Sequence, residues 1–126
     1  MIRRAELSDK TTRLPVKASI TIERGTAVGD DGSGFARELV AADPFFGFAL
    51  EDATGGSSDG DTFINVQYEG AFALTVASST AATAGALVYA SAKNTFTMTS
   101  TSNSLIGRQV GLIDSDTYVN IKGVKD

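Results

Sequence analysis

The chain has 126 residues, of which 42% are apolar and 21% charged, with a net charge of −4 and neither cysteine nor histidine. This composition is too apolar and too weakly charged for a disordered protein, and it suffices for one domain with its own core. The lack of cysteine and histidine excludes serine–histidine–acid triads, thiol catalysis and the usual zinc sites. No apolar run reaches about 18 residues, so we expect no membrane span, and the N-terminus has no apolar segment of the kind that marks a secretory signal.

Residues 1–17 differ in charge from the rest of the chain. They carry a net charge of +3, while residues 18–126 carry −7. A basic tail on an acidic body is typical of an arm that reaches for a partner, although a frayed, solvated terminus has the same composition. We predict an extended basic arm over residues 1–17 and a β-barrel body over residues 18–126. The arm residues expected to contact a partner are Ile2, Arg3, Arg4, Leu7, Lys10, Arg13 and Leu14. Nucleic acid is not expected on the body, because phosphate binding needs a basic face.

Alternation of apolar and polar residues dominates the body. It is clearest in four segments, residues 19–23, 62–68, 95–99 and 117–122. A period of two is typical of strands with one buried face. No window of eleven residues has helical spacing, and turns rich in glycine and aspartate separate the segments. We therefore predict an all-β fold, a small and mostly antiparallel β-barrel or sandwich.

Two parts of the chain resemble each other. Residues 25–50 align without a gap with residues 85–110, a shift of 60, and DTFINV (61–66) aligns with DTYVNI (116–121) at a shift of 55. The difference of five falls in the glycine-rich loop at 55–60, where an insertion costs little. We predict two pseudo-repeated halves, although strands of similar composition also match by chance.

The repeat and the alternation together select a core. Its predicted members are Ile20, Ile22, Val28, Phe46, Leu50, Ile64, Val66, Val88, Ile106, Val110, Val119 and Ile121. Gly47 and Gly107 occupy matching places inside apolar strands, where glycine normally weakens pairing. A β-bulge or a tight bend would explain both glycines.

Acidic side chains cluster in several loops, and each cluster has a structural explanation. Asp30–Asp31–Gly32 resembles the start of a calcium loop, but the other ligand positions of an EF-hand are missing, so we favour a β-turn. The loop at 55–60 lacks the lysine of a phosphate-binding loop, and its flanking acids would repel phosphate. Asp114 and Asp116 suit a solvated turn. Because no spacing selects a catalytic pair of carboxylates, we expect no enzyme, no cofactor and no metal.

The segment 75–104 contains a single charge, Lys93, among 13 serines and threonines and seven alanines. A stretch with so little charge covers itself or meets another chain, because it lacks the lysines that keep strand edges apart. Threonine is also simply a good strand residue. An interface and an ordinary strand region both remain open.

Six short motifs follow one another along the chain. The first three are a Gly-x-x-Val segment at Gly25–Val28, a Phe-Gly-x-Ala segment at Phe46–Ala49 and a strand that ends in glycine at Ile64–Gly70. An Ala-Gly-x-x-Val-Tyr unit follows at Ala84–Tyr89, and a closing pair consists of Leu-Ile-Gly at Leu105–Gly107 and Val-x-Ile at Val119–Ile121. This order resembles the capsid cement, or head decoration, proteins of tailed bacteriophages. The resemblance spans about residues 18–123 and rests on patterned glycines and apolar positions.

The resemblance implies a β-barrel-like body that forms a homotrimer on the outer capsid surface. There it would clamp neighbouring copies of the major capsid protein, with the N-terminal arm along the shell and able to add a strand to a capsid element. Such a protein is made in the host cytoplasm and ends in the virion. Its partners would be the major capsid protein and its own copies, with no nucleic acid, membrane or cofactor.

The alternative function is a free-standing β-sandwich that recognises carbohydrate or a host surface. Such modules usually present an exposed aromatic platform, and this chain has no tryptophan. Tyr68, Tyr89 and Tyr118 are the candidates for that role. An enzyme that works with carboxylates alone is a third and weaker alternative.

Overall fold

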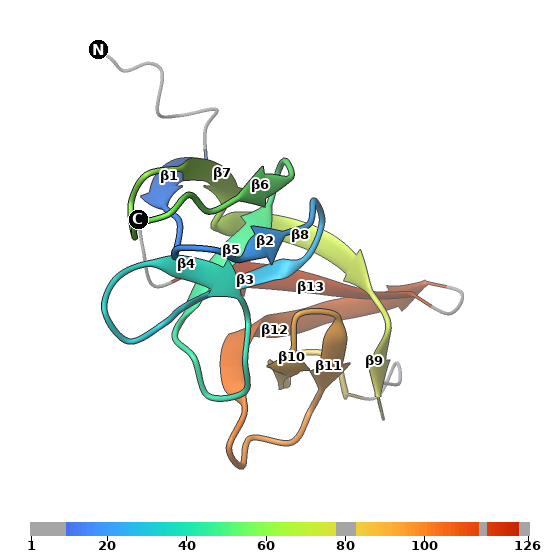
Figure 1. Ribbon diagram of the computed structural model, residues 1–126. Helices are drawn as coiled ribbons and strands as arrows, with labels where there is room; N and C mark the ends of the chain where they lie inside the picture. Colours follow the sequence, from blue (N-terminus) through green and yellow to red (C-terminus); the bar gives the residue numbers. More distant parts are fainter. Residues whose placement is uncertain (1–9, 78–82, 114–115, 124–126) are drawn as a thin grey trace.

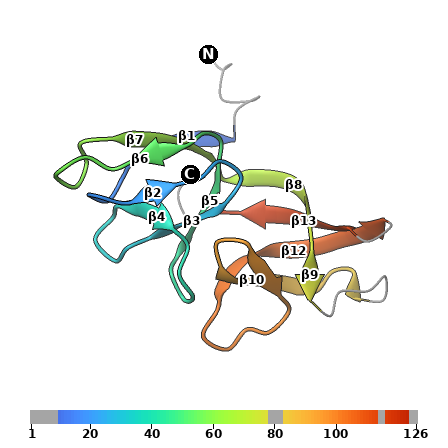
Figure 2. The same cartoon turned by 45° about the vertical axis from the view of Figure 1, so that its right-hand side comes forward.

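The computed structural model describes residues 10–77, 83–113 and 116–123, and every named element within these ranges is a β-strand (Figure 1). The all-β, mostly antiparallel fold predicted from the alternation is confirmed. Within the described ranges there is no helix with the length and hydrophobicity needed to cross a membrane. The strands divide into a first half, residues 11–68, and a second half, residues 69–123, which lie side by side in Figure 2.

The first half contains a five-stranded sheet with the order β1-β7-β5-β3-β4. A small two-stranded sheet, β2-β6, lies beside it. The strand bounds are β1 Thr11–Pro15, β2 Thr21–Ile22, β3 Ala27–Asp30, β4 Ala36–Glu38, β5 Phe45–Ala49, β6 Ala53–Thr54 and β7 Phe63–Gln67.

The second half contains a six-stranded sheet with the order β8-β13-β12-β10-β11-β9. Its strand bounds are β8 Glu69–Leu74, β9 Val76–Ala77, β10 Leu87–Ala92, β11 Thr95–Thr97, β12 Ser104–Ile113 and β13 Asp116–Lys122. Strands β8 and β9 follow each other directly in the sequence but lie at opposite ends of the sheet order. The sheet therefore curls until one continuous segment meets both of its ends.

The first sheet curls in the same way. Strand β1 pairs with β7, and Val16, just after β1, forms a parallel bridge to Ala36 in β4. In the second half, the parallel pair that brings the two ends of the sheet together is Val76 with Phe96. Both residues of this second pair lie 60 positions after their counterparts in the first.

The two pseudo-repeated halves predicted from the sequence are present in the pairing. The order β1-β7-β5-β3-β4 in the first half corresponds to β8-β13-β12-β10-β11 in the second. Even single pairs recur with a shift of 60, since Val28 pairs with Gly47 and Val88 pairs with Gly107. The same shift relates the hydrogen bond from Gly25 N to Ala49 O, 2.8 Å, to that from Gly85 N to Gln109 O, 2.7 Å. Composition alone would not reproduce register and hydrogen bonds in this way.

The hexapeptides lie on equivalent strands, β7 and β13, but the structure corrects their alignment. Val66 pairs with Ala49, and Val119 pairs with Gln109, which is the equivalent of Ala49. The structural shift between these strands is therefore 53 rather than 55, and the loops differ in length by seven rather than five. Because side chains alternate with a period of two, a slip by two positions keeps each side chain on its face. The sequence pattern cannot detect such a slip.

Matching β-bulges explain the glycines inside the apolar strands. In the β3–β5 ladder the register shifts at Phe46, and in the β10–β12 ladder it shifts at Ile106. Gly47 and Gly107 follow these bulges directly. A Cβ at either glycine would lie 2.3 Å or less from a backbone carbonyl oxygen of the neighbouring strand, so no larger residue fits there. The predicted irregularity at both glycines is confirmed.

The same bulges make two of the core predictions wrong. Leu50 is 38% exposed and Val110 is 55% exposed. A bulge adds one residue to a strand and thereby reverses the faces of the residues that follow. Ala49 and Gln109 consequently point inward in place of their neighbours.

Most of the other predicted core residues are buried in two clusters. Nine of the twelve predicted positions are buried, and Ile20 is half-buried against the first cluster; the buried ones are Ile22, Val28, Phe46, Ile64, Val66, Val88, Ile106, Val119 and Ile121. The first cluster lies inside the first half. The second combines the interior of the second half with side chains from the outer face of the first half.

Phenylalanines from the first half fill the second half. The ring of Phe48 lies 4.7 Å from that of Phe72 and 6.0 Å from that of Phe96, and Phe45 meets Phe48 edge-on at 5.6 Å. Ring pairs at such distances add to the burial of apolar area. The two halves therefore share a core, which fixes one against the other.

Candidate functional site

The structure separates the predicted arm residues into three groups. Ile2, Arg3, Arg4 and Leu7 lie outside the described residues. Lys10 and Arg13 are exposed: Lys10 Nζ lies 3.8 Å from a Glu69 carboxylate oxygen, and the Arg13 guanidinium lies 4.8 Å from the centre of the Phe63 ring.

Leu14 is not an arm residue. It is only 1% exposed and belongs to the core of the first half, because β1 pairs with β7 along its length. The expected boundary between arm and body at residue 17 is therefore too late, since residues 11–15 are a strand of the body. Residues 1–17 are basic and contain few apolar residues, so the sequence gave no indication that Leu14 would be buried.

The acidic turns use their carboxylates internally. One oxygen of Asp30 accepts hydrogen bonds from the amides of Gly32 and Gly34, and one oxygen of Asp31 accepts from Ser33 and Phe35. Such bonds from nearby amides to a carboxylate define Asx-type turns. They support the turn prediction over a calcium loop.

The acids near the glycine-rich loop are used in the same manner. Asp59 accepts from the amide of Ala18 at 2.8 Å, and Asp61 accepts from the amide of Ser58 at 3.0 Å. Glu51 and Asp52 accept from backbone amides on other segments. Among the described residues no three acidic side chains come together as a metal site would require. These carboxylates hold loops in place.

Ion pairs account for the raised pKa values of two basic groups. The hydrogen bond from Arg37 to Asp43, 2.9 Å, raises the pKa of the Arg37 guanidinium. The hydrogen bond from Lys93 to Glu38, 3.0 Å, is the main cause that raises the pKa of Lys93, with Glu23 adding to it. Both shifts favour the charged form that these groups already have at neutral pH, so they stabilise the fold and prepare no proton transfer.

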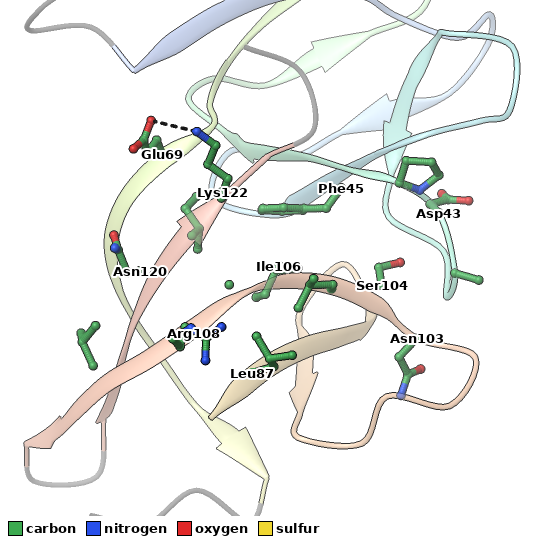
Figure 3. A pocket seen from close by; sticks show the side chains of 16 residues that line it. Asp43, Phe45, Glu69, Leu87, Asn103, Ser104, Ile106, Arg108, Asn120 and Lys122 are labelled. Carbon is green, nitrogen blue, oxygen red and sulfur yellow. Dashed lines mark ion pairs between the residues drawn. The ribbon is translucent and has the colours of Figure 1, made fainter. Parts of the chain in front are cut away.

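A groove of about 590 Å³ lies where the end of the loop before β5 meets the second sheet (Figure 3). Its walls come from both halves: Ala42, Asp43, Pro44, Phe45, Glu69, Leu87, Asn103, Ser104, Leu105, Ile106, Gly107, Arg108, Val110, Asn120, Ile121 and Lys122. Figure 3 shows Glu69 and Lys122 at one end and Asp43, Ser104 and Asn103 at the other. A concave surface of this size is the main candidate for a binding site on the described part of the molecule.

Exposed apolar side chains concentrate at this groove. Six large apolar residues are exposed in the described part of the chain, and Leu87, Leu105 and Val110 line the groove. Leu105 is 50% exposed although it lies in a central strand of the second sheet. A gathering of exposed apolar side chains with a polar rim is typical of a surface that meets another protein.

Several polar side chains of the groove are paired within the molecule. Lys122 lies 3.9 Å from Glu69, and Arg108 donates to the backbone oxygen of Gly85 at 2.6 Å. Ser104 is 4% exposed, and its hydroxyl is the buried side-chain group without a hydrogen-bond partner among the described residues. The hydroxyl oxygen is covered by its surroundings, so it belongs to the wall behind the groove and is not open to a ligand.

Sequence reasoning did not find the groove. It assigned Val110 to the core and treated 75–104 as a possible interface without selecting residues, although Leu87 and Ser104 lie in that segment. The sequence feature that pointed to the groove was the lack of charge in residues 75–104. This feature indicates a region of the chain but does not select individual residues.

The sequence model of the phage cement protein family matches residues 7–122 of the chain. No curated protein and no solved structure matches. The matched segment includes both pseudo-repeated sheets and every residue that lines the groove.

Proposed function

The chain belongs to the phage cement protein family, whose members are structural proteins that stabilise the capsid and not enzymes, and from this premise we propose that it sits on the outer capsid surface. There it binds neighbouring copies of the major capsid protein and holds them together. The family match over nearly the whole body carries the proposal. The internally paired carboxylates and the exposed apolar groove support it, because they suit a protein that binds other proteins and carries out no chemistry.

The finer parts of the proposal are a homotrimer and a capsid-binding arm. The arm is shortened to Ile2, Arg3, Arg4 and Leu7 with Lys10 and Arg13 at its base, since β1 belongs to the body. When extended, residues 1–9 reach about 30 Å, which is far enough to lie across a neighbouring subunit. A basic and partly apolar segment suits strand addition to an acidic partner. A trimer would multiply one weak arm contact through effective concentration.

The test is removal of residues 1–9 only. Deleting residues 1–17 would remove β1 and the buried Leu14, so a loss of binding would report unfolding. We expect the shorter deletion to leave thermal unfolding unchanged and to reduce co-sedimentation with expanded, DNA-free capsids at least tenfold. The double substitution Arg3→Gln and Arg4→Gln isolates the contribution of charge, and Arg24→Gln is the matched control in the body.

Light scattering after size exclusion tests the trimer separately. A mass of three chains is expected for the full protein and for the deletion. A monomer that still binds capsids would exclude the trimer and leave the cementing role standing. Full capsid binding by the deletion variant would exclude the arm.

A further inference from the structure

In the first half, the place that corresponds to the groove is filled by the chain itself. Gly123, just after β13, is buried and donates a hydrogen bond from its amide to the backbone oxygen of Tyr68 at 2.6 Å. A Cβ at this glycine would lie 2.1 Å from the backbone oxygen of Phe46. The glycine that follows strand β13 therefore lies directly between Phe46 and Tyr68, and only glycine fits at this point.

The repeat relates this place to the groove. Phe46 corresponds to Ile106 by the shift of 60, and Tyr68 corresponds to Ile121 by the shift of 53 that the strand pairing defines. Ile106 and Ile121 both line the groove, as does Gly107, the counterpart of Gly47. The groove is thus the second-half version of a slot that, in the first half, holds the glycine at the end of strand β13.

The surface of the groove suits the same kind of occupant. Leu105 and Val110 would pack against apolar side chains on either side of a glycine, which would approach the backbone of Ile106. In the first half the contact is made through the backbone, since the Gly123 amide bonds to the Tyr68 oxygen and the glycine lies against the backbone of Phe46.

The described part of the chain does not supply a second segment of this kind. Within residues 10–77, 83–113 and 116–123, the segment that fills such a slot is the one at Gly123, which is already used in the first half. The parts outside the described residues, 1–9, 78–82, 114–115 and 124–126, contain no glycine. The occupant is therefore sought in another protein, and for a cement protein that partner is the capsid.

We infer that the groove binds an extended, glycine-containing segment of the major capsid protein, flanked by apolar residues. This inference rests on the proposed function and adds to it the binding site and the chemistry of the segment. It makes the second half the side of the molecule that grips the shell, in addition to the N-terminal arm.

The first experiment uses the repeat as its own control. Leu105→Arg and Val110→Arg place a charge in the groove, while Leu50→Arg changes the position that corresponds to Val110 on the other half. All three side chains are exposed, so the variants are expected to fold, which circular dichroism checks. We expect the two groove variants to lose at least tenfold in affinity for expanded, DNA-free capsids and the control to bind like the unchanged protein.

Substitution of Ser104 is a control in the wall of the groove. Ser104→Ala removes a buried hydroxyl that has no partner within the described structure, so thermal stability should stay equal or rise. Because the hydroxyl is covered, capsid affinity should stay close to that of the unchanged protein. Unchanged binding by the two groove variants, Leu105→Arg and Val110→Arg, would overturn the inference.

Photo-cross-linking identifies the occupant. A benzophenone amino acid at position 105 is irradiated on capsids, and the linked peptide is sequenced by mass spectrometry. A glycine-containing peptide of the capsid protein supports the inference, whereas a peptide from this chain would overturn it and assign the groove to self-association. If the unchanged protein does not bind capsids at all, the proposed function fails and the inference fails with it. If it binds and the groove variants bind equally, only the inference fails.

Discussion

The two halves share one strand order but differ in what covers them. In the first half, β2 and β6 lie beside the five-stranded sheet, Gly123 fills the slot next to β5, and the outer phenylalanines are buried against the second half. In the second half, the corresponding slot is an open groove, and the residues that correspond to Phe45 and Phe48 are the exposed Leu105 and Arg108.

This difference shows how a repeated unit comes to have an exposed face. When two equivalent units of one chain pack head to tail, one face of the first unit contacts a different face of the second unit. Each of these two faces is present on both units, so one copy of each has no partner within the chain. The face that is buried on the first half is the face that remains exposed on the second. Duplication thus supplies a contact surface without a new fold.

The largest expected effect tests the shared core through equivalent positions. Phe48→Ala removes a ring that packs against Phe72 and Phe96. It should cost about 3–5 kcal/mol of unfolding free energy. Arg108→Ala, at the corresponding exposed position, should change it by about 0.5 kcal/mol or less. Urea unfolding measures both. Equal losses at the two positions would contradict the head-to-tail arrangement.

A smaller effect tests whether the bulges are equivalent. Gly47→Ala and Gly107→Ala each place a Cβ within 2.3 Å of a backbone oxygen, and Gly47 also has a φ of 152°. We expect each to cost about 2–3 kcal/mol, with the larger loss at Gly47 because strain adds to the clash. Gly111→Ala, where a Cβ meets nothing within 4 Å, is the control. A substitution at either bulge that matched this control would contradict the assigned register.

The smallest effect concerns a charge that only one half has. Burial favours a higher pKa for Asp31, but the amides of Ser33 and Phe35 and the Lys17 ammonium outweigh it and hold the pKa below its ordinary value of 3.8. A lowered pKa in the folded state stabilises the protein above pH 3.8. This contribution is lost as pH falls through the folded-state pKa.

Asp31→Asn should therefore cost about 1 kcal/mol at neutral pH and flatten the loss of stability in acid. Ser91, the corresponding residue of the second half, is neutral, so Ser91→Ala should leave the pH dependence unchanged. Urea unfolding between pH 2.5 and pH 7 distinguishes the two. A steep acid dependence that persists in Asp31→Asn would assign it to other carboxylates.

The sequence by itself determined the strand type and most of the inward faces. The alternation of apolar and polar residues indicates which side of a strand is apolar. It predicted that Ile64, Val66, Val119 and Ile121 point inward, and these residues are buried. The repeat could also be recognised in the sequence, because Gly47 and Gly107, which lie next to the bulges, recur at a shift of 60. These features are local or periodic, so a single chain displays them without its partners.

Only the tertiary structure decided what covers each face. The slip by two positions between the hexapeptides leaves the alternation unchanged, so the pattern could not show it. The burial of Leu14 depends on β7, which is distant in the sequence, and the exposure of Leu50 and Val110 follows from bulges that the pairing creates. Gly123 returns to the first half and lies against Phe46, whereas the corresponding place at Ile106 lines the open groove. The alternation of apolar and polar residues determines to which face of a strand a side chain points, whereas the burial of that side chain depends on segments that are distant in the sequence.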